Sequence, residues 1–113
     1  MWKVVDAEGI SYSPYKTGVA NIKRVLGQDE LQEMKFSGFG FIQVPPGGEF
    51  QVHVHPEREE IYYVLSGSGT IEVEGKPVEA RPGITLHISG ETAHGIKNDT
   101  GETLTIIYVT AWA

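Results

Sequence analysis

Histidine and carboxylate side chains lie close together in the middle of this sequence, at spacings that suit metal binding. His53 and His55 are two residues apart in a segment of alternating character. Positions i and i+2 of a β-strand point to the same face, so both imidazoles are expected to project side by side. Glu59 and Glu60 open the next strand-like run, and either could face inward because both parities of that run are apolar. Imidazole nitrogen and carboxylate oxygen are ligands for first-row divalent metals, so this segment outlines a metal site.

Two further histidines follow in the second half of the chain. His94 would supply a third imidazole and complete the set. His87 alternates with Leu86 and Ile88, which are expected to face the core, so His87 is predicted to point outward. An isolated pair of histidines on a strand is commonly a surface feature. The prediction of metal binding therefore depends on the whole set.

The segments that must position these residues are short and rich in β-branched and aromatic residues. Clusters of Gly, Pro, Ser, Asn and Asp separate them, with the chemistry of tight turns. Many short strands with almost no helix predict an all-β sandwich or barrel. The expected strands are 19–26, 36–44, 50–55, 60–65, 70–74, 77–80, 84–88, 93–97 and 103–110.

The N-terminal part is less regular. Residues 2–5 could form a short strand, 10–17 have the composition of a loop, and 28–34 could form at most one short helical turn. A length of 113 residues is enough for one domain with its own core. We therefore expect a single domain over 1–113, with an N-terminal extension over 1–18.

Composition restricts the possible partners. The formal net charge is −6, which disfavours nucleic acid and anionic membrane surfaces. No Cys is present, which excludes disulfides, thiolate zinc sites and cysteine nucleophiles. No apolar run is long enough to span a bilayer, and the first residues lack the apolar region of a signal peptide. A cytoplasmic location is the resulting expectation.

Two of the expected strands are apolar on both faces, namely 61–65 and 104–109. A sheet in a monomeric sandwich needs only one apolar face, because the other meets water. The second face is therefore expected to meet a partner subunit or the N-terminal segment, and we predict a homodimer.

Two spaced patterns surround the candidate ligands. The first is Gly47-x5-His53-x-His55-x4-Glu60-x6-Gly67, and the second is Gly83-x10-His94-x3-Asn98. Over residues 36–110 the sequence resembles the cupin superfamily, whose first motif is matched at every stated position. In the second motif, Ser89 and Glu91 replace the usual Pro and Gly.

The resemblance implies a double-stranded β-helix, or jelly-roll barrel, with one metal ion at its mouth. Carried over by position, the ligands are His53, His55, Glu60 and His94, and the spacing to Gly67 selects Glu60 rather than Glu59. A set of three imidazoles and one carboxylate suits Mn²⁺, Fe²⁺, Co²⁺, Ni²⁺ or Cu²⁺, and Zn²⁺ is also possible.

The function expected from this site is that of a small mononuclear metalloenzyme acting on a small organic molecule. Its chemistry would be either dioxygenase-like or redox-neutral, as in a decarboxylase, isomerase or lyase. The alternative is a module that binds a small ligand or metal without turnover. A purely structural role is disfavoured by the complete ligand set.

Parity also selects residues that could orient a substrate. Tyr62 shares the parity of Glu60, and Gln51 shares that of His53, so both are candidates to line the pocket. Gln43 and Tyr108 are weaker candidates. Gly38 and Gly40 lie within one strand, where glycine permits close approach by another group.

Overall fold

The computed structural model describes residues 5–15, 19–27, 31 and 35–112, and most of its regular structure is β. Within this part of the chain, no helix is long and apolar enough to cross a membrane. The expected strand at 2–5 and helical turn at 28–34 lie largely outside the described residues. The described elements are η1, a 3-10 turn (Ala7–Gly9), and strands β1 (Ser13–Pro14), β2 (Asn21–Leu26), β3 (Phe36–Val44), β4 (Glu49–His53), β5 (Arg58–Ser66), β6 (Gly69–Val73), β7 (Lys76–Ala80), β8 (Thr85–Ile88), β9 (His94–Lys97) and β10 (Leu104–Trp112).

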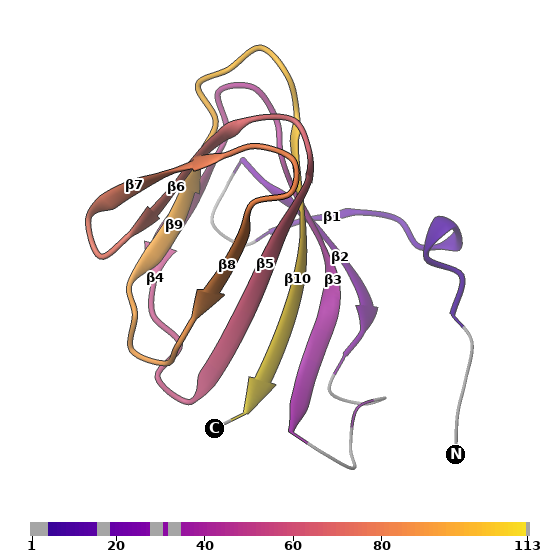
Figure 1. The fold of residues 1–113 in the computed structure, drawn as a ribbon. Coiled ribbons are helices and arrows are strands. Elements are labelled where there is room, and N and C mark those ends of the chain that lie inside the picture. The colour runs from indigo at the N-terminus through magenta and orange to yellow at the C-terminus, as the bar shows by residue number, and fades with distance from the viewer. Residues whose placement is uncertain (1–4, 16–18, 28–30, 32–34, 113) are drawn as a thin grey trace.

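The strands form two antiparallel sheets that face each other (Figure 1). The larger sheet has the order β1-β2-β3-β10-β5-β8, and the smaller has the order β4-β9-β6-β7. From β3 onward the chain passes repeatedly from one sheet to the other, which is the connectivity of a jelly roll. The predicted all-β double-stranded β-helix is confirmed.

Alternation along the strands decides which side chains enter the space between the sheets. On β10, Leu104, Ile106 and Tyr108 are buried, whereas the residues between them are only half-buried. On β5, Tyr62 and Val64 are buried in the same way. These side chains belong to the core between the sheets.

Motif residues without a metal-binding side chain stabilise the loops. The buried Asn98 amide donates hydrogen bonds to the carbonyl oxygens of Val44 (2.9 Å) and Glu102 (2.7 Å), and thereby joins the β9–β10 loop to the end of β3. Gly67 has φ +84°, and a Cβ there would lie 2.0 Å from the carbonyl oxygen of Thr103. Only glycine fits this turn, for reasons of both conformation and space.

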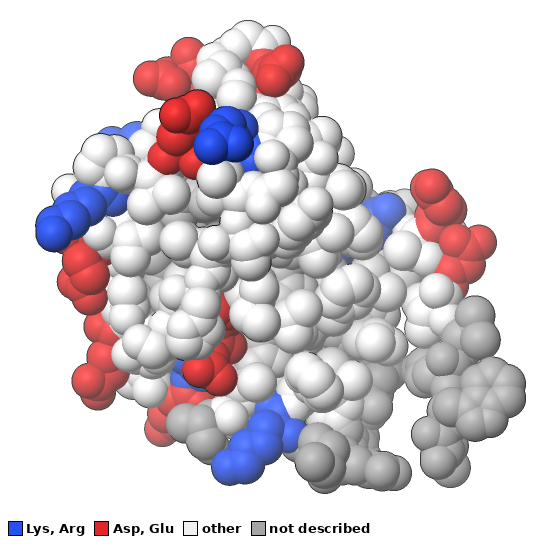
Figure 2. Space-filling view, in the orientation of Figure 1, with Lys and Arg blue, Asp and Glu red and all other residues white. Residues whose placement is uncertain are grey.

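The outer face of the larger sheet is apolar. Ile61, Tyr63 and Leu65 of β5 are 41–47% exposed, and Ile107 and Val109 of β10 lie half-buried beside them. Figure 2 shows that charged side chains on the pictured face gather mainly at its rim, leaving the area over β5, β8 and β10 largely uncharged. The predicted second apolar face is therefore present, and the homodimer stays a prediction.

Candidate metal centre

Three strands and one loop bring the candidate ligands to the same end of the barrel. His53 ends β4 and lies directly opposite His94, the first residue of β9. His55 follows two residues after His53. Glu60 projects inward from β5, across from both. The candidate ligands thus come from both sheets. The sequence pattern of a single strand does not show that they meet.

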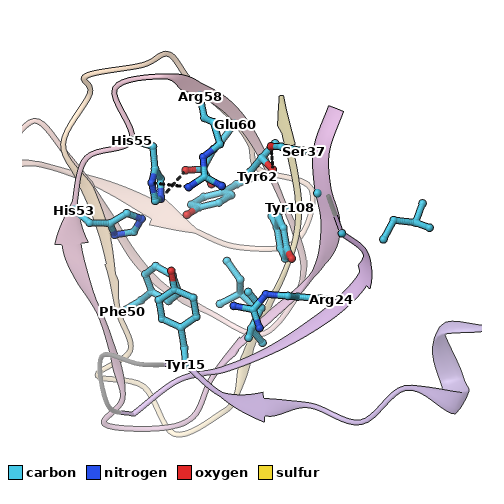
Figure 3. Close-up of a pocket in the computed structure, with 16 residues that line it drawn as sticks. Tyr15, Arg24, Ser37, Phe50, His53, His55, Arg58, Glu60, Tyr62 and Tyr108 are labelled. Carbon is cyan, nitrogen blue, oxygen red and sulfur yellow. Dashed lines mark hydrogen bonds and ion pairs between the residues drawn. The ribbon is translucent and has the colours of Figure 1, made fainter. Parts of the chain in front are cut away.

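The four side chains converge closely. One ligand atom from each of them lies within 4.8 Å of all the others. Oε1 of Glu60 is 3.2 Å from Nε2 of His94 and 3.5 Å from Nε2 of His55. The ring of His53 lies 4.3 Å from that of His94, centroid to centroid. Figure 3 shows His53, His55 and Glu60 directed toward a common point.

Backbone hydrogen bonds orient two of the imidazoles. Nδ1 of His53 lies 2.8 Å from the carbonyl oxygen of Gln51, and Nδ1 of His94 lies 2.9 Å from that of Thr92. A carbonyl oxygen only accepts, so Nδ1 carries a proton in both rings and Nε2 is the nitrogen left to bind a metal. This arrangement is typical of metal-ligating histidine, whose second nitrogen is held by a neighbouring acceptor.

Two buried polar atoms at the centre of this cluster are unsatisfied. Oε1 of Glu60 and Nε2 of His94 are both inaccessible to water and have no hydrogen-bond partner. Their contact of 3.2 Å is close, but it is not directed as a hydrogen bond. Leaving such atoms unsatisfied in the interior costs several kcal/mol, on the order of 2–7 per group by transfer estimates. A cation bound between them would satisfy both, so the residues present fit a divalent metal.

The protonation equilibria respond to the same packing. Burial lowers the pKa of His55 to about 4, and the positive charges of His53, Arg58 and His94 add to this against the attraction of Glu60. Burial works to raise the pKa of Glu60, but the neighbouring imidazoles, His94 first, hold it below its usual value. The carboxylate is therefore ionised and the His55 imidazole neutral, which are the forms that bind metal.

The structure distinguishes the two adjacent glutamates. Glu60 is 5% exposed and belongs to the cluster. Glu59 lies on the outer face, where its Oε2 is 2.7 Å from Nε2 of His87. His87 points outward, as its alternation with Leu86 and Ile88 predicts.

A cavity of about 260 Å³ opens beside the cluster. Tyr62, which was selected by parity, and Tyr108, a weaker candidate, line it. The ring of Tyr108 lies across Gly38 and Gly40, and a Cβ at Gly40 would come within 2.9 Å of it. The glycines of β3 therefore make room for an aromatic wall of the cavity.

Gln51 and Gln43 lie elsewhere. Gln51 is exposed in a shallow depression beside Glu72 and Lys97, and it does not line the main cavity. The reason is an irregularity in β4. Phe50 pairs with Ile96 and His53 with His94, so β4 has one residue more than β9 over the same span. This bulge gives Phe50, rather than Gln51, the inward position of His53. Gln43 shares the outward parity of Phe39 and Phe41 and does not line the cavity either.

Several residues that line the cavity were not selected from the sequence, among them Tyr15, Arg24 and Arg58. Arg58 is two residues before Glu60 on β5, so its parity could have revealed it. Its Nη2 lies 3.5 Å from Nδ1 of His55, and its guanidinium stacks 5.0 Å above the ring of Trp112. Tyr15 stacks on Phe50 at 4.5 Å, a contact that depends on how the N-terminal segment folds back.

Comparison with known proteins agrees with this geometry. The family model described as Cupin domain matches residues 40–110. An oxalate-binding protein of Thermotoga maritima is 35% identical over 88% of this chain and 80% of its own length. Quercetin 2,3-dioxygenase of Bacillus subtilis is 30% identical over 77% of this chain, which corresponds to 28% of that enzyme. The crystal structure of a predicted oxalate decarboxylase of Thermotoga maritima superimposes with a TM-score of 0.89, at 24% identity, over 98% of this chain and all of that one.

The match to the family model covers more than half of the chain, and it includes the three strands and the loop that carry all four candidate ligands. The chain therefore belongs to the cupin family.

Proposed function

We propose that this cupin binds one divalent transition metal ion through His53, His55, Glu60 and His94, and uses it to turn over a small organic acid. The observation that carries the proposal is the pair of buried, unsatisfied atoms, Oε1 of Glu60 and Nε2 of His94, inside a converging set of four ligands. The cavity that opens beside them has room for a small molecule.

The donor set of three nitrogens and one oxygen favours Mn²⁺, Fe²⁺, Co²⁺, Ni²⁺ or Cu²⁺ over a closed zinc site. With four protein ligands, an octahedral ion retains two positions for water or substrate. When bound, such an ion polarises a carboxylate or carbonyl oxygen and offsets developing negative charge.

Side chains around the site suit an acidic substrate. Arg58 presents a guanidinium beside His55, and Trp112 holds it there by stacking. Burial raises the pKa of Tyr62 well above its ordinary value, so its hydroxyl stays protonated and able to donate a hydrogen bond next to Glu60. The apolar side chains of Ile42 and Phe50 keep water from part of the cavity.

Two classes of reaction are consistent with this site. Redox-neutral chemistry, such as decarboxylation, is supported by the oxalate-related relatives, and oxygen-dependent chemistry by the quercetin dioxygenase. The guanidinium beside the metal ligands, which suits an acidic substrate, favours the redox-neutral branch. Purified protein, analysed for metal and assayed for carbon dioxide release and oxygen uptake with small organic acids, separates the two. Protein that retains no metal after anaerobic purification and binds none on titration would contradict both.

The second candidate is a binding module without turnover, which the similarity to an oxalate-binding protein favours. Here Arg58 and the metal would hold the acid without further chemistry. A thermal-shift screen with metal-loaded protein tests it. Stabilisation by an acid that remains chemically unchanged after prolonged incubation supports this candidate over the enzyme.

We also propose that the chain forms a homodimer through the outer face of the larger sheet. Ile61, Tyr63 and Leu65 supply the exposed apolar area there. Light scattering at micromolar concentration should give twice the chain mass, and Tyr63→Lys should shift it toward the monomer. A wild-type protein that is monomeric at this concentration would contradict the proposal.

A further inference from the structure

The cavity contains two arginines, and neither forms an ion pair with a carboxylate among the described residues. The guanidinium of Arg58 lies beside the His55 ring and stacks on Trp112. Arg24 of β2 lines the cavity without a carboxylate partner in the described part of the chain. The sequence has 15 acidic and 9 basic residues, so carboxylates are plentiful. Elsewhere, Arg81 pairs with Glu79 and Lys97 with Glu72. Two unpaired guanidinium groups in one concave site are a natural place for an anion.

The two arginines lie on different sides of the cavity. Arg58 is next to the metal ligands, whereas in Figure 3 Arg24 lies across the cavity from His55 and Glu60, with its guanidinium directed inward. Arg24 pairs with Gly40 in the sheet, and the ring of Tyr108 lies over that glycine. Arg24 is close enough to Tyr108 for its charge to oppose the rise in the tyrosine pKa that burial causes. The far wall of the cavity is therefore cationic.

The rest of the cavity is lined by a mixture of tyrosine, hydroxyl and apolar side chains. Ile22, Ile42 and Phe50 supply apolar surface to this lining. The cavity volume is about 260 Å³. Oxalate, with six non-hydrogen atoms, would leave part of this space empty, whereas a five-carbon dicarboxylate has nine such atoms.

We infer that the ligand of this site is a small organic acid with two anionic ends and an apolar middle, longer than oxalate, and that Arg24 binds its second anionic group. The inference rests on the proposed function for the first end, which lies at the metal ligands and Arg58. Arg24 then determines specificity by selecting dianions over monoanions. The apolar wall formed by Ile22 and Phe50 contacts the carbon chain between the two ends.

Calorimetric titration with a matched set of acids tests this inference. Protein loaded with Mn²⁺ is titrated with glutarate, with pentanoate, which has the same chain length and one carboxylate, and with oxalate. The variants are Arg24→Gln, which removes the charge, Arg24→Lys, which restores it, and Arg81→Gln, a matched loss of charge at an exposed turn outside the cavity.

Wild-type protein should bind glutarate at least about tenfold more tightly than pentanoate, because a charge-assisted hydrogen bond to a carboxylate has roughly that effect. Arg24→Gln should abolish this difference and leave pentanoate and oxalate affinities within about twofold of wild type. Arg24→Lys should restore part of the glutarate affinity, and Arg81→Gln should behave as wild type. Circular dichroism confirms that each variant is folded.

Several outcomes would overturn the inference: no glutarate binding by wild type, equal binding of glutarate and pentanoate, or an equal loss in Arg24→Gln and Arg81→Gln. An equal loss of oxalate and glutarate affinity in Arg24→Gln would refute the assignment of a longer ligand. Metal content, measured separately by electron paramagnetic resonance of Mn²⁺, tests the proposed function. If no metal binds, the glutarate titration is repeated with metal-free protein, where the dependence on Arg24 still decides the inference.

Discussion

On its inner face, β5 presents Glu60 to His94, and one residue earlier, on its outer face, it presents Glu59 to His87. Both are contacts between a carboxylate and an imidazole, and the outer one is shorter, at 2.7 Å against 3.2 Å. The inner side chains are 6% and 1% exposed, and the outer ones 56% and 60%.

The contrast shows that burial, rather than residue type or distance, gives the inner pair its chemistry. In water the outer pair is solvated and contributes little. In the interior the same groups cannot turn to water, and two of their atoms remain without a hydrogen-bond partner. A metal ion would satisfy both atoms, so the inner face of β5 carries the candidate site and the outer face does not.

The largest difference between the faces should appear in metal affinity. Glu60→Gln keeps the shape of the side chain but removes its charge, and we expect metal affinity to fall by roughly 100-fold or more. Loss of an outer-shell partner alone typically costs about 10–100-fold. Glu59→Gln should leave the affinity within about twofold. Competition with a chromogenic chelator measures both, and equal losses in the two variants would contradict the assignment of Glu60.

Metal loading should also stabilise the fold. At a free metal concentration of about 100 times Kd, the free energy of unfolding should rise by about 2.7 kcal/mol. Glu59→Gln should retain this gain, and Glu60→Gln should lose most of it. Urea denaturation with and without metal provides the measurement. A gain of equal size in Glu60→Gln would show that the metal binds elsewhere.

Neighbouring apolar residues of β5 allow a third comparison. Val64 is fully buried and Leu65 is 47% exposed. Val64→Ala should lower the free energy of unfolding by roughly 2 kcal/mol, from lost burial and the cavity that remains. Leu65→Ala should cost within about 0.5 kcal/mol in the monomer. If a partner covers the outer face, the cost at Leu65 should grow with protein concentration, which denaturation at two concentrations detects.

Stability of the metal-free protein should depend on pH through the inner groups. The pKa of His55 is lowered from its ordinary value near 6.5 to about 4, so stability falls as pH drops through this interval, where the unfolded chain takes up a proton and the folded one does not. The lowered pKa of Glu60 removes further stability at still lower pH.

His94 acts in the opposite sense, because Glu60 and the Thr92 carbonyl raise its pKa against the effect of burial. Its contribution is complete below about pH 6.5 and is lost as pH rises through the raised value. Stability should therefore pass through a maximum near pH 6.5, above the interval in which His55 acts and below the raised pKa of His94. Denaturation across pH 4–8 tests this, with His87→Gln as the outer-face control, and a flat profile would contradict it.

The smallest effect is expected for the outer pair itself. A double-mutant cycle with His87→Gln and Glu59→Gln should give a coupling free energy below about 1 kcal/mol, which decreases further with added salt. A coupling of several kcal/mol that does not respond to salt would mean that the outer face is covered in solution. That result would favour the dimer proposal.

Much of the fold and of the candidate site could be predicted from local pattern. Alternation and turn residues located most of the strands, because both signals depend on neighbouring positions only. His53, His55 and His94 were identified from type and spacing, and Tyr62 from its parity with Glu60. These four side chains do border the cavity or the cluster in the structure.

The prediction for Gln51 was wrong and the choice between Glu59 and Glu60 stayed open for a shared physical reason, because alternation within one strand did not decide either. Glu59 and Glu60 could not be separated by alternation, because both faces of β5 are apolar, and only the family spacing selected Glu60. Gln51 was expected beside His53, but the bulge between Phe50 and His53 reverses the parity. A bulge is defined by the partner strand, so β4 alone carries no reliable sign of it.

The sequence by itself thus determined most of the strands, their turns and the candidate imidazole ligands, since each of these depends on short-range geometry. Only the tertiary structure decided which glutamate is buried, which residues form the far wall of the cavity, and that Arg24 and Arg58 oppose each other across it. Those features require two sheets to meet, and the pairing that brings β2 and β5 to the same cavity is set by contacts between residues distant in sequence.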